Sequence, residues 1–302
     1  GGWYHSLALL DTGEVVGWGY NEYGQLGDGT SGNEKITPVY VLKGATPGNA
    51  DGHLAGVVAI AGGAFHSLAT LDTDEVASWG RNDSNQLGDN SGTNKSSPVY
   101  VLKGATPGNA DGRLTGVVAI ESSYDFSLAL LDTSEVVGWG PNLNGQLGDG
   151  TNNNKPTPVY VTKGATPGNA DGRLTGVVAI AAGSFHSLAV LDTDEVASWG
   201  YNWYGQLGNG NSGGPADESS PVYVLKGATP GNADGRLTGV VAIAAGGPHS
   251  LATLDTDEVA GWGNNNDGQV GDGTSGNERI TPVYVVKGAT PGNADGRLTG
   301  IK

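Results

Sequence analysis

A segment of about sixty residues occurs five times in this chain of 302 residues, and the repetition limits the fold more than any other feature. The triplet Ser-Leu-Ala marks each copy, and the residues before it are His5, His66, Phe126, His186 and His249. Trp-Gly, Gln-Leu-Gly or Gln-Val-Gly, Pro-Val-Tyr-Val and KGATPGNADG follow in the same order every time. No linker or change of composition separates the copies. We therefore predict a single domain of five repeats over residues 1–302.

Each repeat is predicted to form four short strands. In the second repeat, GVVAIA at 56–61 is a continuous apolar run, which is typical of a strand covered on both faces. HSLATL at 66–71 and EVASWG at 75–80 flank a tight turn at 72–74, which indicates a hairpin. SPVYVLKG at 97–104 is the fourth strand, and its proline suits a strand start or edge.

Four antiparallel strands in a fixed repeat describe the blade of a β-propeller. Five repeats predict an all-β, five-bladed propeller. One tryptophan per repeat is large enough to pack between adjacent blades, and we expect this structural role for Trp18, Trp79, Trp139, Trp199 and Trp262. A parallel β-helix would need a much shorter repeat, and a helical solenoid would need helices.

The pattern GVVAIAAG-x-x-HSLAL-x-DT-x-EV-x-x-WG-x-N-x-x-GQLGDGT resembles the repeat of the regulator-of-chromosome-condensation family. The resemblance covers all five repeats, and it implies a propeller, typically of seven blades. This chain has five repeats, each lengthened by KGATPGNADGRLTG, so seven blades would require further sequence. The family's nucleotide-exchange and chromatin roles are not carried over, because the chain is strongly acidic and lacks a basic tail.

The first repeat lacks the apolar run that precedes the Ser-Leu-Ala triplet elsewhere, and LTGIK at 298–302 is the beginning of such a run. We expect the two ends to share one closing blade, and the residues assigned to closure or strand exchange are Leu298, Ile301, Leu7 and Leu9. Two alternatives stay open. In the first alternative the sequence is a segment of a longer polypeptide, and in the second the strand is exchanged between chains.

The net charge is −16 and the isoelectric point is about 4.4, so nucleic acid and anionic membranes are poor partners. No run approaches the roughly 20 apolar residues of a membrane-spanning helix, so no membrane insertion is expected. The chain has no cysteine, which excludes disulfides and zinc–thiolate sites. It begins without methionine, as a processed chain does, and we expect an extracellular or cell-surface protein from a microbe.

Catalytic and metal sites find little support. Asp and Glu flank the turn in all five repeats, and five identical pairs indicate a scaffold, since an active site normally breaks symmetry. The repeated histidine is interpreted as a strand-edge residue bonded to backbone, because Phe126 replaces it once. Asn49 and Asp51 resemble half of a calcium loop but lack its later acidic ligand, so we expect no cofactor and keep calcium as a minor candidate. The chain is not expected to be an enzyme. A carbohydrate-active or hydrolytic enzyme would need an asymmetric acidic cluster.

The loops after Trp-Gly differ between repeats while the rest stays constant: YNEYG, RNDSN, PNLNG, YNWYG and NNNDG. A constant frame with variable loops is typical of a binding surface. The candidate partner-binding residues are Tyr20, Tyr23, Tyr201, Trp203 and Tyr204, because exposed Tyr and Trp are frequent interface anchors. The alternative is that they cover the blade edges against solvent.

The sequence thus predicts a non-enzymatic protein-interaction or structural scaffold module that presents variable loops from a rigid propeller to a protein partner. The second hypothesis is a self-assembling extracellular filament or surface-layer subunit, joined to further copies of itself by strand exchange between chain ends.

Overall fold

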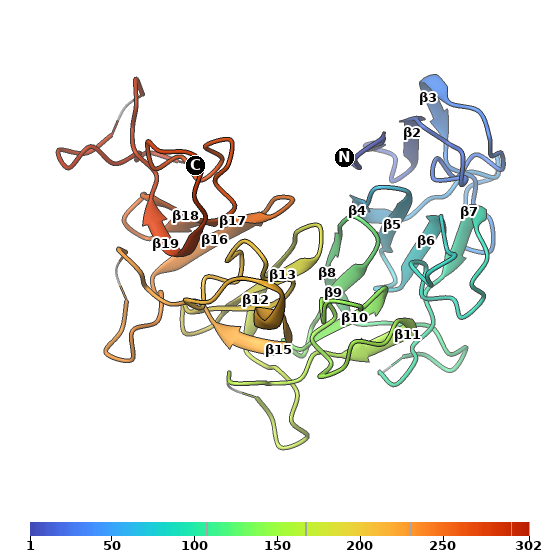
Figure 1. The fold of residues 1–302 in the computed structure, drawn as a ribbon. Coiled ribbons are helices and arrows are strands. Elements are labelled where there is room, and N and C mark those ends of the chain that lie inside the picture. The colour runs from blue at the N-terminus through green and yellow to red at the C-terminus, as the bar shows by residue number, and fades with distance from the viewer. Residues whose placement is uncertain (107, 167, 230, 291, 302) are drawn as a thin grey trace. The chain divides into compact units, whose positions relative to one another are not determined.

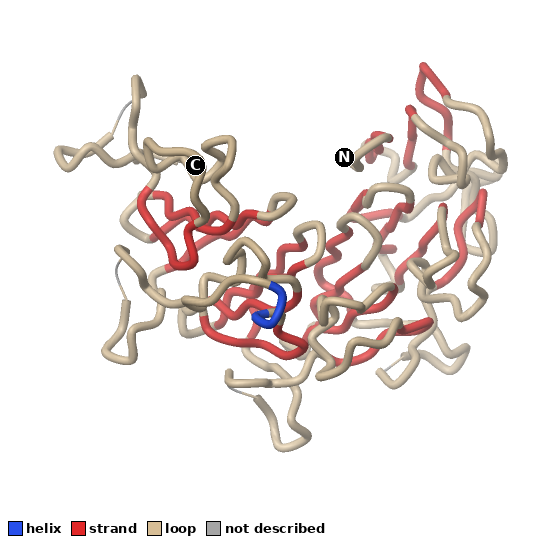
Figure 2. Tube along the Cα trace, viewed as in Figure 1, coloured by secondary structure: helices blue, strands red, loops and turns tan. Residues whose placement is uncertain are grey.

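The computed structural model describes residues 1–106, 108–166, 168–229, 231–290 and 292–301. Almost all of its regular structure is β-strand, and the one helix among these residues is the short 3₁₀ helix η1 at Gly214–Ala216 (Figure 2). The strands form five antiparallel sheets, one for each repeat (Figure 1). This confirms the predicted all-β fold of five repeats.

Sheets 1 to 3 follow the chain in order. Sheet 1 has three strands, β1 (His5–Leu9), β2 (Val15–Gly19) and β3 (Lys35–Tyr40). Sheet 2 contains β4 (Val57–Gly62), β5 (His66–Leu71), β6 (Val76–Gly80) and β7 (Lys95–Tyr100). Sheet 3 contains β8 (Val117–Ser122), β9 (Ser127–Leu131), β10 (Val136–Gly140) and β11 (Lys155–Tyr160).

Sheets 4 and 5 repeat the four-stranded order. Sheet 4 contains β12 (Val177–Ala182), β13 (His186–Leu191), β14 (Val196–Gly200) and β15 (Glu218–Tyr223). Sheet 5 contains β16 (Val240–Ala245), β17 (His249–Leu254), β18 (Val259–Gly263) and β19 (Arg279–Tyr284).

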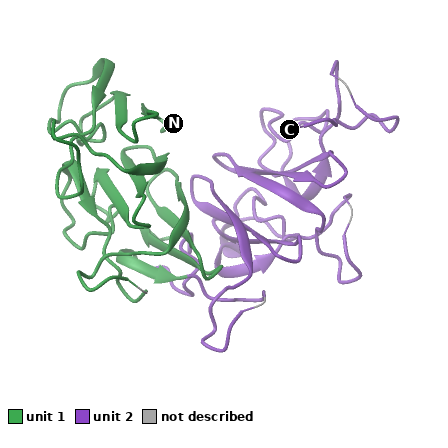
Figure 3. Ribbon diagram, turned by 180° about the vertical axis from the view of Figure 1, so that it is seen from behind, with its two compact units in different colours: residues 1–143, 153–160 green, residues 144–152, 161–302 purple. Residues whose placement is uncertain are grey.

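The chain divides into two compact units, shown in green and purple in Figure 3. Unit 1 comprises residues 1–143 and 153–160 and holds sheets 1 to 3. Unit 2 comprises residues 144–152 and 161–302 and holds sheets 4 and 5. The expectation of a single domain over the whole chain stays a prediction, and each unit is described by itself.

The central hairpin of each sheet follows from its turn. In sheet 2, β5 and β6 pair antiparallel with Leu68 opposite Ser78. The backbone of Asp74 has a φ of 61°, a left-handed conformation that Asp and Asn adopt more readily than most residues. The amide of Asp74 donates to the carbonyl of Leu71 at 3.0 Å and closes the turn. The hairpin therefore forms where the Asp-Thr-Asp signal predicts it.

The fourth strand begins earlier than the sequence pattern suggests. β7 starts at Lys95 and ends at Tyr100, whereas the pattern placed this strand at 97–104. Pro98 lies inside the strand, which a proline tolerates because β7 is the outer strand of its sheet and the register against β6 shifts there. After Tyr100 the chain folds back on itself, with an isolated bridge between Leu102 and Arg113.

The hydrophobic core lies between consecutive sheets of the same unit. One cluster joins sheet 1 to sheet 2 and contains Val15, Val41, Val57, Leu71 and Trp79, all buried. Unit 1 has a second cluster around Trp139, and unit 2 has one around Trp262. Small side chains in the first strands allow neighbouring sheets to approach. Each unit is thus stabilised by sheet-on-sheet packing in which a tryptophan is a large central member.

Candidate functional site

The loops after each Trp-Gly pair have the same residue at one position and different residues at the others. The fixed residue in the first repeat is Asn21, which is fully buried. Its Oδ1 accepts a hydrogen bond of 3.0 Å from the amide of Leu26, and its Nδ2 donates to Thr30 at 3.2 Å. The Oε1 of Gln25 accepts from the amide of Tyr23 at 3.1 Å. These bonds hold the loop from inside, so the residues beside Asn21 are free to vary.

Six aromatic side chains from such loops and from the segments before β1, β5 and β9 gather in unit 1. We call them the aromatic patch: Trp3, Tyr4, Tyr20, Tyr23, Phe65 and Tyr124. Tyr4 stacks on Phe65, with ring centroids 5.1 Å apart and planes at 11°. Tyr23 meets Phe65 edge-on at 5.3 Å, and Trp3 meets Tyr124 at 5.0 Å. Their contacts make the patch continuous across three repeats.

The patch is open to solvent. Trp3 is 55% exposed and Tyr4 is 52% exposed, while Tyr20 is 37% exposed. Large aromatic side chains that pack on one another and still face water are the side chains that anchor protein interfaces. The geometry therefore suits contact with another macromolecule.

One cation lies against the patch. The guanidinium carbon of Arg81 is 5.4 Å from the ring centroid of Tyr23 and 5.7 Å from that of Phe65. Its Nη2 donates to Asp83 at 2.8 Å, and its Nη1 lies 3.5 Å from Asp125. Burial raises the pKa of Asp125, and the charge of Arg81 partly opposes that increase. The patch thus has an Arg and two carboxylates along one side.

The five residues predicted to bind a partner fall in both units. Tyr20 and Tyr23 are members of the aromatic patch in unit 1. In unit 2, Tyr201 meets Phe185 edge-on at 6.1 Å, Trp203 is 52% exposed, and Tyr204 donates its backbone amide to Gln206 at 3.0 Å.

Sequence reasoning missed the other members of the patch. Trp3, Tyr4, Phe65 and Tyr124 precede the Ser-Leu-Ala strand at positions that vary between repeats as much as the loops do. That variability is the signal by which they could have been found.

The tryptophans expected to lie between blades occupy two kinds of environment. Trp79, Trp139, Trp199 and Trp262 are fully buried, and each donates its Nε1 to the backbone carbonyl of a glutamine in the preceding repeat. Trp18 is partly exposed, and its Nε1 has no hydrogen-bond partner among the residues that the structure describes.

The repeated histidine forms a hydrogen bond with a serine side chain of the next sheet at His5, His66 and His186, whereas the sequence had suggested a bond to backbone. His5 Nε2 is 2.8 Å from Ser67 Oγ, and Ser67 donates to the carbonyl of Gln25 at 2.8 Å. Since serine has one proton, His5 must donate from Nε2. Burial and, to a smaller extent, the positive N-terminus lower the pKa of His5 to about 4. Burial also lowers the pKa of His66 to about 3, so both rings are neutral. These histidines therefore join neighbouring sheets.

The turn glutamates and the calcium candidates belong to one structural cluster. Glu14 accepts hydrogen bonds from Thr12 at 2.8 Å and from Asn49 Nδ2 at 2.6 Å, and His53 Nδ1 lies 3.1 Å away. The Oδ1 of Asn49 accepts the amide of His53 at 3.0 Å, while Asp51 is exposed. In the part of the chain that is described, no three His, Asp or Glu residues are grouped as a metal site. Calcium binding stays an untested hypothesis.

Later repeats build the same cluster with arginine. In the second repeat, Arg113 lies 3.3 Å from Glu75 and its guanidinium stacks on Tyr100 at 3.6 Å. His53 takes the place of Arg113 in the first repeat and stacks on Tyr40 at 4.1 Å. Both Arg113 and His53 have a flat N–H-bearing group that reaches the turn glutamate and stacks on a tyrosine, so either residue keeps the cluster intact. Its role is to fasten the lengthened KGATPGNADG segment to the sheet.

One carboxylate breaks the repeat symmetry. Glu121 in β8 occupies a position where other repeats have Ala61, Ala181 and Ala244. Burial raises the pKa of Glu121 to about 7. Asp125, four residues later, accepts from Gln86 at 3.4 Å. Both lie in the third repeat, which also has Phe126 at the position where the other repeats have histidine.

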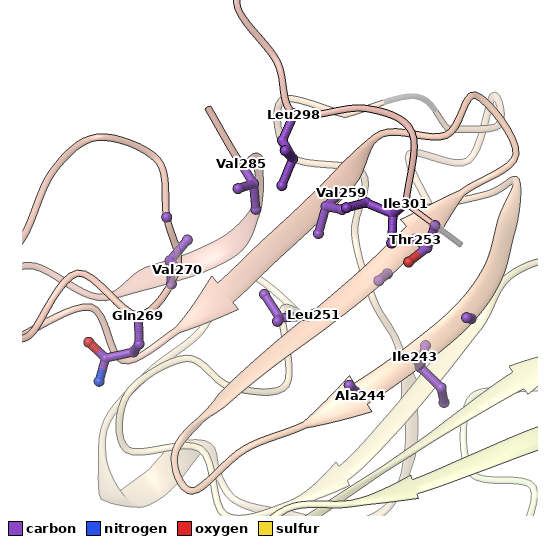
Figure 4. A pocket seen from close by; sticks show the side chains of 13 residues that line it. Ile243, Ala244, Leu251, Thr253, Val259, Gln269, Val270, Val285, Leu298 and Ile301 are labelled. Atoms are coloured by element: carbon purple, nitrogen blue, oxygen red, sulfur yellow. The ribbon is translucent and has the colours of Figure 1, made fainter. Parts of the chain in front are cut away.

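An apolar pocket of about 380 Å³ lies on sheet 5 in unit 2 (Figure 4). Leu251 and Val259 line it from β17 and β18, and Leu298 and Ile301 approach from the C-terminal segment. Two of the residues assigned to closure therefore pack on sheet 5. The other two, Leu7 and Leu9, lie in β1 and pack against the core between sheets 1 and 2. Closure between the chain ends stays a prediction.

The fold and these repeated junctions define a β-propeller protein with one blade per repeat. Two family models described as the regulator of chromosome condensation (RCC1) repeat match more than half of the chain, at residues 1–25, 57–86, 135–190, 177–206, 194–253 and 240–269. The chain therefore belongs to the RCC1 repeat family, as its sequence pattern had suggested.

Similar proteins are longer than this chain. The mitochondrial RCC1 domain-containing protein RUG3 of Arabidopsis thaliana is 29% identical over 289 residues, which cover 94% of this chain and 57% of that protein. The secretion-regulating guanine nucleotide exchange factor of Mus musculus is 30% identical over 298 residues, with 94% and 59% covered. Yeast RCC1 (Prp20), solved with Kap60 bound, has a TM-score of 0.71 at 25% identity, with 94% and 62% covered.

These relatives correct the expected location. A mitochondrial plant protein and a secretion-regulating mouse exchange factor are not extracellular or microbial surface proteins, so the extracellular prediction is wrong. That expectation relied on the missing start methionine, which does not report compartment. Among the described residues, no helix is long and apolar enough to span a bilayer.

The relatives also bear on catalysis and on assembly. One of them is an exchange factor, so the expectation that the chain is not an enzyme stays a prediction. None of the three is a filament or surface-layer protein, and nothing supports the hypothesis of an extracellular filament. Self-association and the exclusion of nucleic acid are likewise untested.

Proposed function

We propose that the chain is a protein-interaction module and that the aromatic patch of unit 1 is its contact surface. The observation that carries this proposal is the patch itself, six aromatic rings in mutual contact with Trp3 and Tyr4 more than half exposed. A monomer gains little by exposing such rings to water, whereas an interface buries them.

The framework beneath the patch supports the same function. The buried Asn21 and Gln25 fix the loop that carries Tyr20 and Tyr23, so the rings are held in place before a partner arrives. A preorganised surface loses little side-chain freedom on binding. A related propeller, yeast RCC1, was solved with Kap60 bound, which is consistent with a role in binding proteins.

The experiment compares partner capture by the parent chain and by two variants. The patch variant carries Trp3→Ser, Tyr4→Ser and Tyr20→Ser. The control variant carries Val58→Ser and Val118→Ser, which remove exposed apolar side chains of unit 1 outside the patch. Quantitative mass spectrometry of proteins bound to each immobilised chain should show partners lost from the patch variant and retained by the control. Equal recovery on all three chains would refute the proposal.

Guanine nucleotide exchange is a second candidate, because the mouse exchange factor matches 94% of this chain at 30% identity. The chain spans 59% of that protein, so the activity is a proposal here. Its test is the release of a fluorescent guanine nucleotide from a panel of GTP-binding proteins. Release that is no faster with the chain than without it would exclude exchange activity for that panel.

A further inference from the structure

We propose that the partner presents an arginine or lysine side chain, which binds at the edge of the aromatic patch between Glu22 and Tyr23. This inference rests on the proposed interaction function and adds the chemistry of the partner. Its basis is a small polar pocket beside Tyr23, an acid with no partner, and an equivalent acid–cation pair in the next repeat.

The pocket has a volume of about 130 Å³ and lies in unit 1. Its lining residues are Glu22, Tyr23, Ser31, Asn94 and Ser96. This set offers one carboxylate, two serine hydroxyls, an amide and an aromatic ring, and all of its formal charge is negative. Such a lining favours an N–H donor with positive charge over an anion or an apolar group.

Glu22 is exposed, and among the described residues it has neither an ion pair nor a hydrogen-bond partner. Its charge still acts locally. Burial raises the pKa of Tyr20, and Tyr23 and Glu22 raise it further. A carboxylate that lies next to aromatic rings without a cation is complementary to a cation from outside.

The second repeat shows the arrangement completed within the chain. Asp83 occupies the position of Glu22, and Arg81 occupies that of Tyr20. There the guanidinium donates to Asp83 from Nη2 at 2.8 Å and from Nε at 3.0 Å. The first repeat keeps the acid but has tyrosine in place of the arginine, so the described residues supply no such cation to Glu22.

The rings of the patch already accept a guanidinium. Arg81 lies 5.4 Å from the ring centroid of Tyr23, within the range of a cation–π contact. Two lysines adjoin the pocket in sequence and are already paired. Lys35, the cation nearest to Glu22 in sequence, pairs with Asp28 at 3.4 Å, and Lys95, which lies between Asn94 and Ser96, pairs with Asp89 at 3.7 Å. The chain as a whole carries a charge of −16, which attracts a basic segment and raises its rate of encounter.

The test uses three blocked tripeptides, acetyl-Gly-Xaa-Gly-amide, in which Xaa is arginine, lysine or citrulline. Each is titrated into the full chain, and binding is followed by the NMR shifts of the backbone amides of Ser31 and Ser96. Citrulline matches the shape of arginine without its charge. We expect the arginine and lysine peptides to bind about three- to tenfold more tightly than the citrulline peptide, and less tightly as salt is added.

The variant Glu22→Gln should weaken binding of the arginine peptide about three- to tenfold. Asp267→Asn is the matched control, since Asp267 is an exposed acid on the equivalent loop of the fifth repeat. Thermal unfolding of each variant verifies that it is folded. Equal affinity for citrulline and arginine, or no effect of Glu22→Gln, would overturn the inference.

The same variants separate this inference from the proposed function. If partner capture is lost in the patch variant and unchanged in Glu22→Gln, the patch binds a partner, but the inference that the partner presents a cationic side chain at Glu22 is wrong. If Glu22→Gln weakens capture of the same partners as the patch variant does, both proposals are supported.

Discussion

The indole nitrogen of Trp79 donates a hydrogen bond of 2.9 Å to the backbone carbonyl of Gln25, a residue of the preceding repeat. The same carbonyl accepts the hydroxyl of Ser67 at 2.8 Å. A carbonyl oxygen has two lone pairs, so both are used by one neighbouring sheet. Trp139 and Gln86 repeat the bond at 2.9 Å in the next junction.

Trp79→Phe is expected to lower the free energy of unfolding by about 2–4 kcal/mol, because it removes a buried hydrogen bond and leaves unfilled volume. Trp18→Phe is the matched control and should cost less than about 1 kcal/mol, since Trp18 is partly exposed and its indole has no described partner. Urea denaturation followed by circular dichroism measures both. Equal losses would mean that the junction contributes nothing beyond local packing.

Acid should destabilise the fold through the buried histidines. The pKa of His66 is about 3 in the folded chain and about 6.5 when unfolded, so below pH 6.5 the unfolded chain takes up a proton that the folded chain does not. Stability is therefore complete above pH 6.5 and falls by up to about 1.4 kcal/mol per pH unit for each such histidine, down to the folded pKa.

Thermal unfolding between pH 4 and pH 8 measures this slope. His66→Phe is the comparison variant, because Phe126 already occupies the equivalent position in the third repeat. It should unfold with a smaller slope below pH 6.5. An unchanged slope would show that carboxylates alone set the acid sensitivity.

Gly88→Ala should be strongly destabilising for two reasons that a second variant can separate. Gly88 has a φ of 66°, and a Cβ there would lie 2.9 Å from Trp139 Cδ1. Gly112 has a φ of 78° with nothing within 4 Å of such a Cβ, so Gly112→Ala reports the backbone strain alone, about 1 kcal/mol. We expect Gly88→Ala to cost at least about 2 kcal/mol in chemical denaturation. If the two variants lose the same stability, the indole has moved aside at no cost.

Glu121→Ala should stabilise the chain at alkaline pH. Burial raises the pKa of Glu121 to about 7, so the folded state loses stability as the pH rises from 4.5 through 7 and the carboxylate ionises. Alanine, present at the equivalent positions of three other repeats, removes this penalty. We expect a gain of up to about 3 kcal/mol at pH 8, from about 1.4 kcal/mol per pH unit between 4.5 and 7, and none at pH 4. Glu34→Ala, which removes an exposed acid, should show no such difference.

The repeat pattern predicted the sheets well because their strands are set by local alternation and by turn chemistry. The hairpin between β5 and β6 is where the Asp-Thr-Asp turn indicated. The fourth strand was placed less well, because Pro98 reads as a strand start in the sequence. A proline can lie within a strand only where its missing N–H is not needed for pairing, as in the outer strand of a sheet. The sequence does not show which strand is the outer one.

The candidate site was predicted only in part. Tyr20 and Tyr23 were found from loop variability, but their contact with Phe65 joins two repeats and has no local pattern. Asn49 was considered as a calcium ligand, whereas its side-chain amide donates a hydrogen bond to Glu14, which is thirty-five residues earlier. Contacts between residues so far apart in the sequence depend on how the sheets pack, and no local sequence pattern predicts them.

The junction between sheets also explains how a chain of this kind can grow. The second, third and fourth repeats each contain a tryptophan and a serine that donate to the repeat before, together with a glutamine carbonyl that accepts from the repeat after. Duplication of one whole repeat within the gene would therefore insert a sheet that already fits both neighbours. Evolution can change the number of sheets in such a protein without inventing a new interface, provided that duplications respect the sixty-residue period.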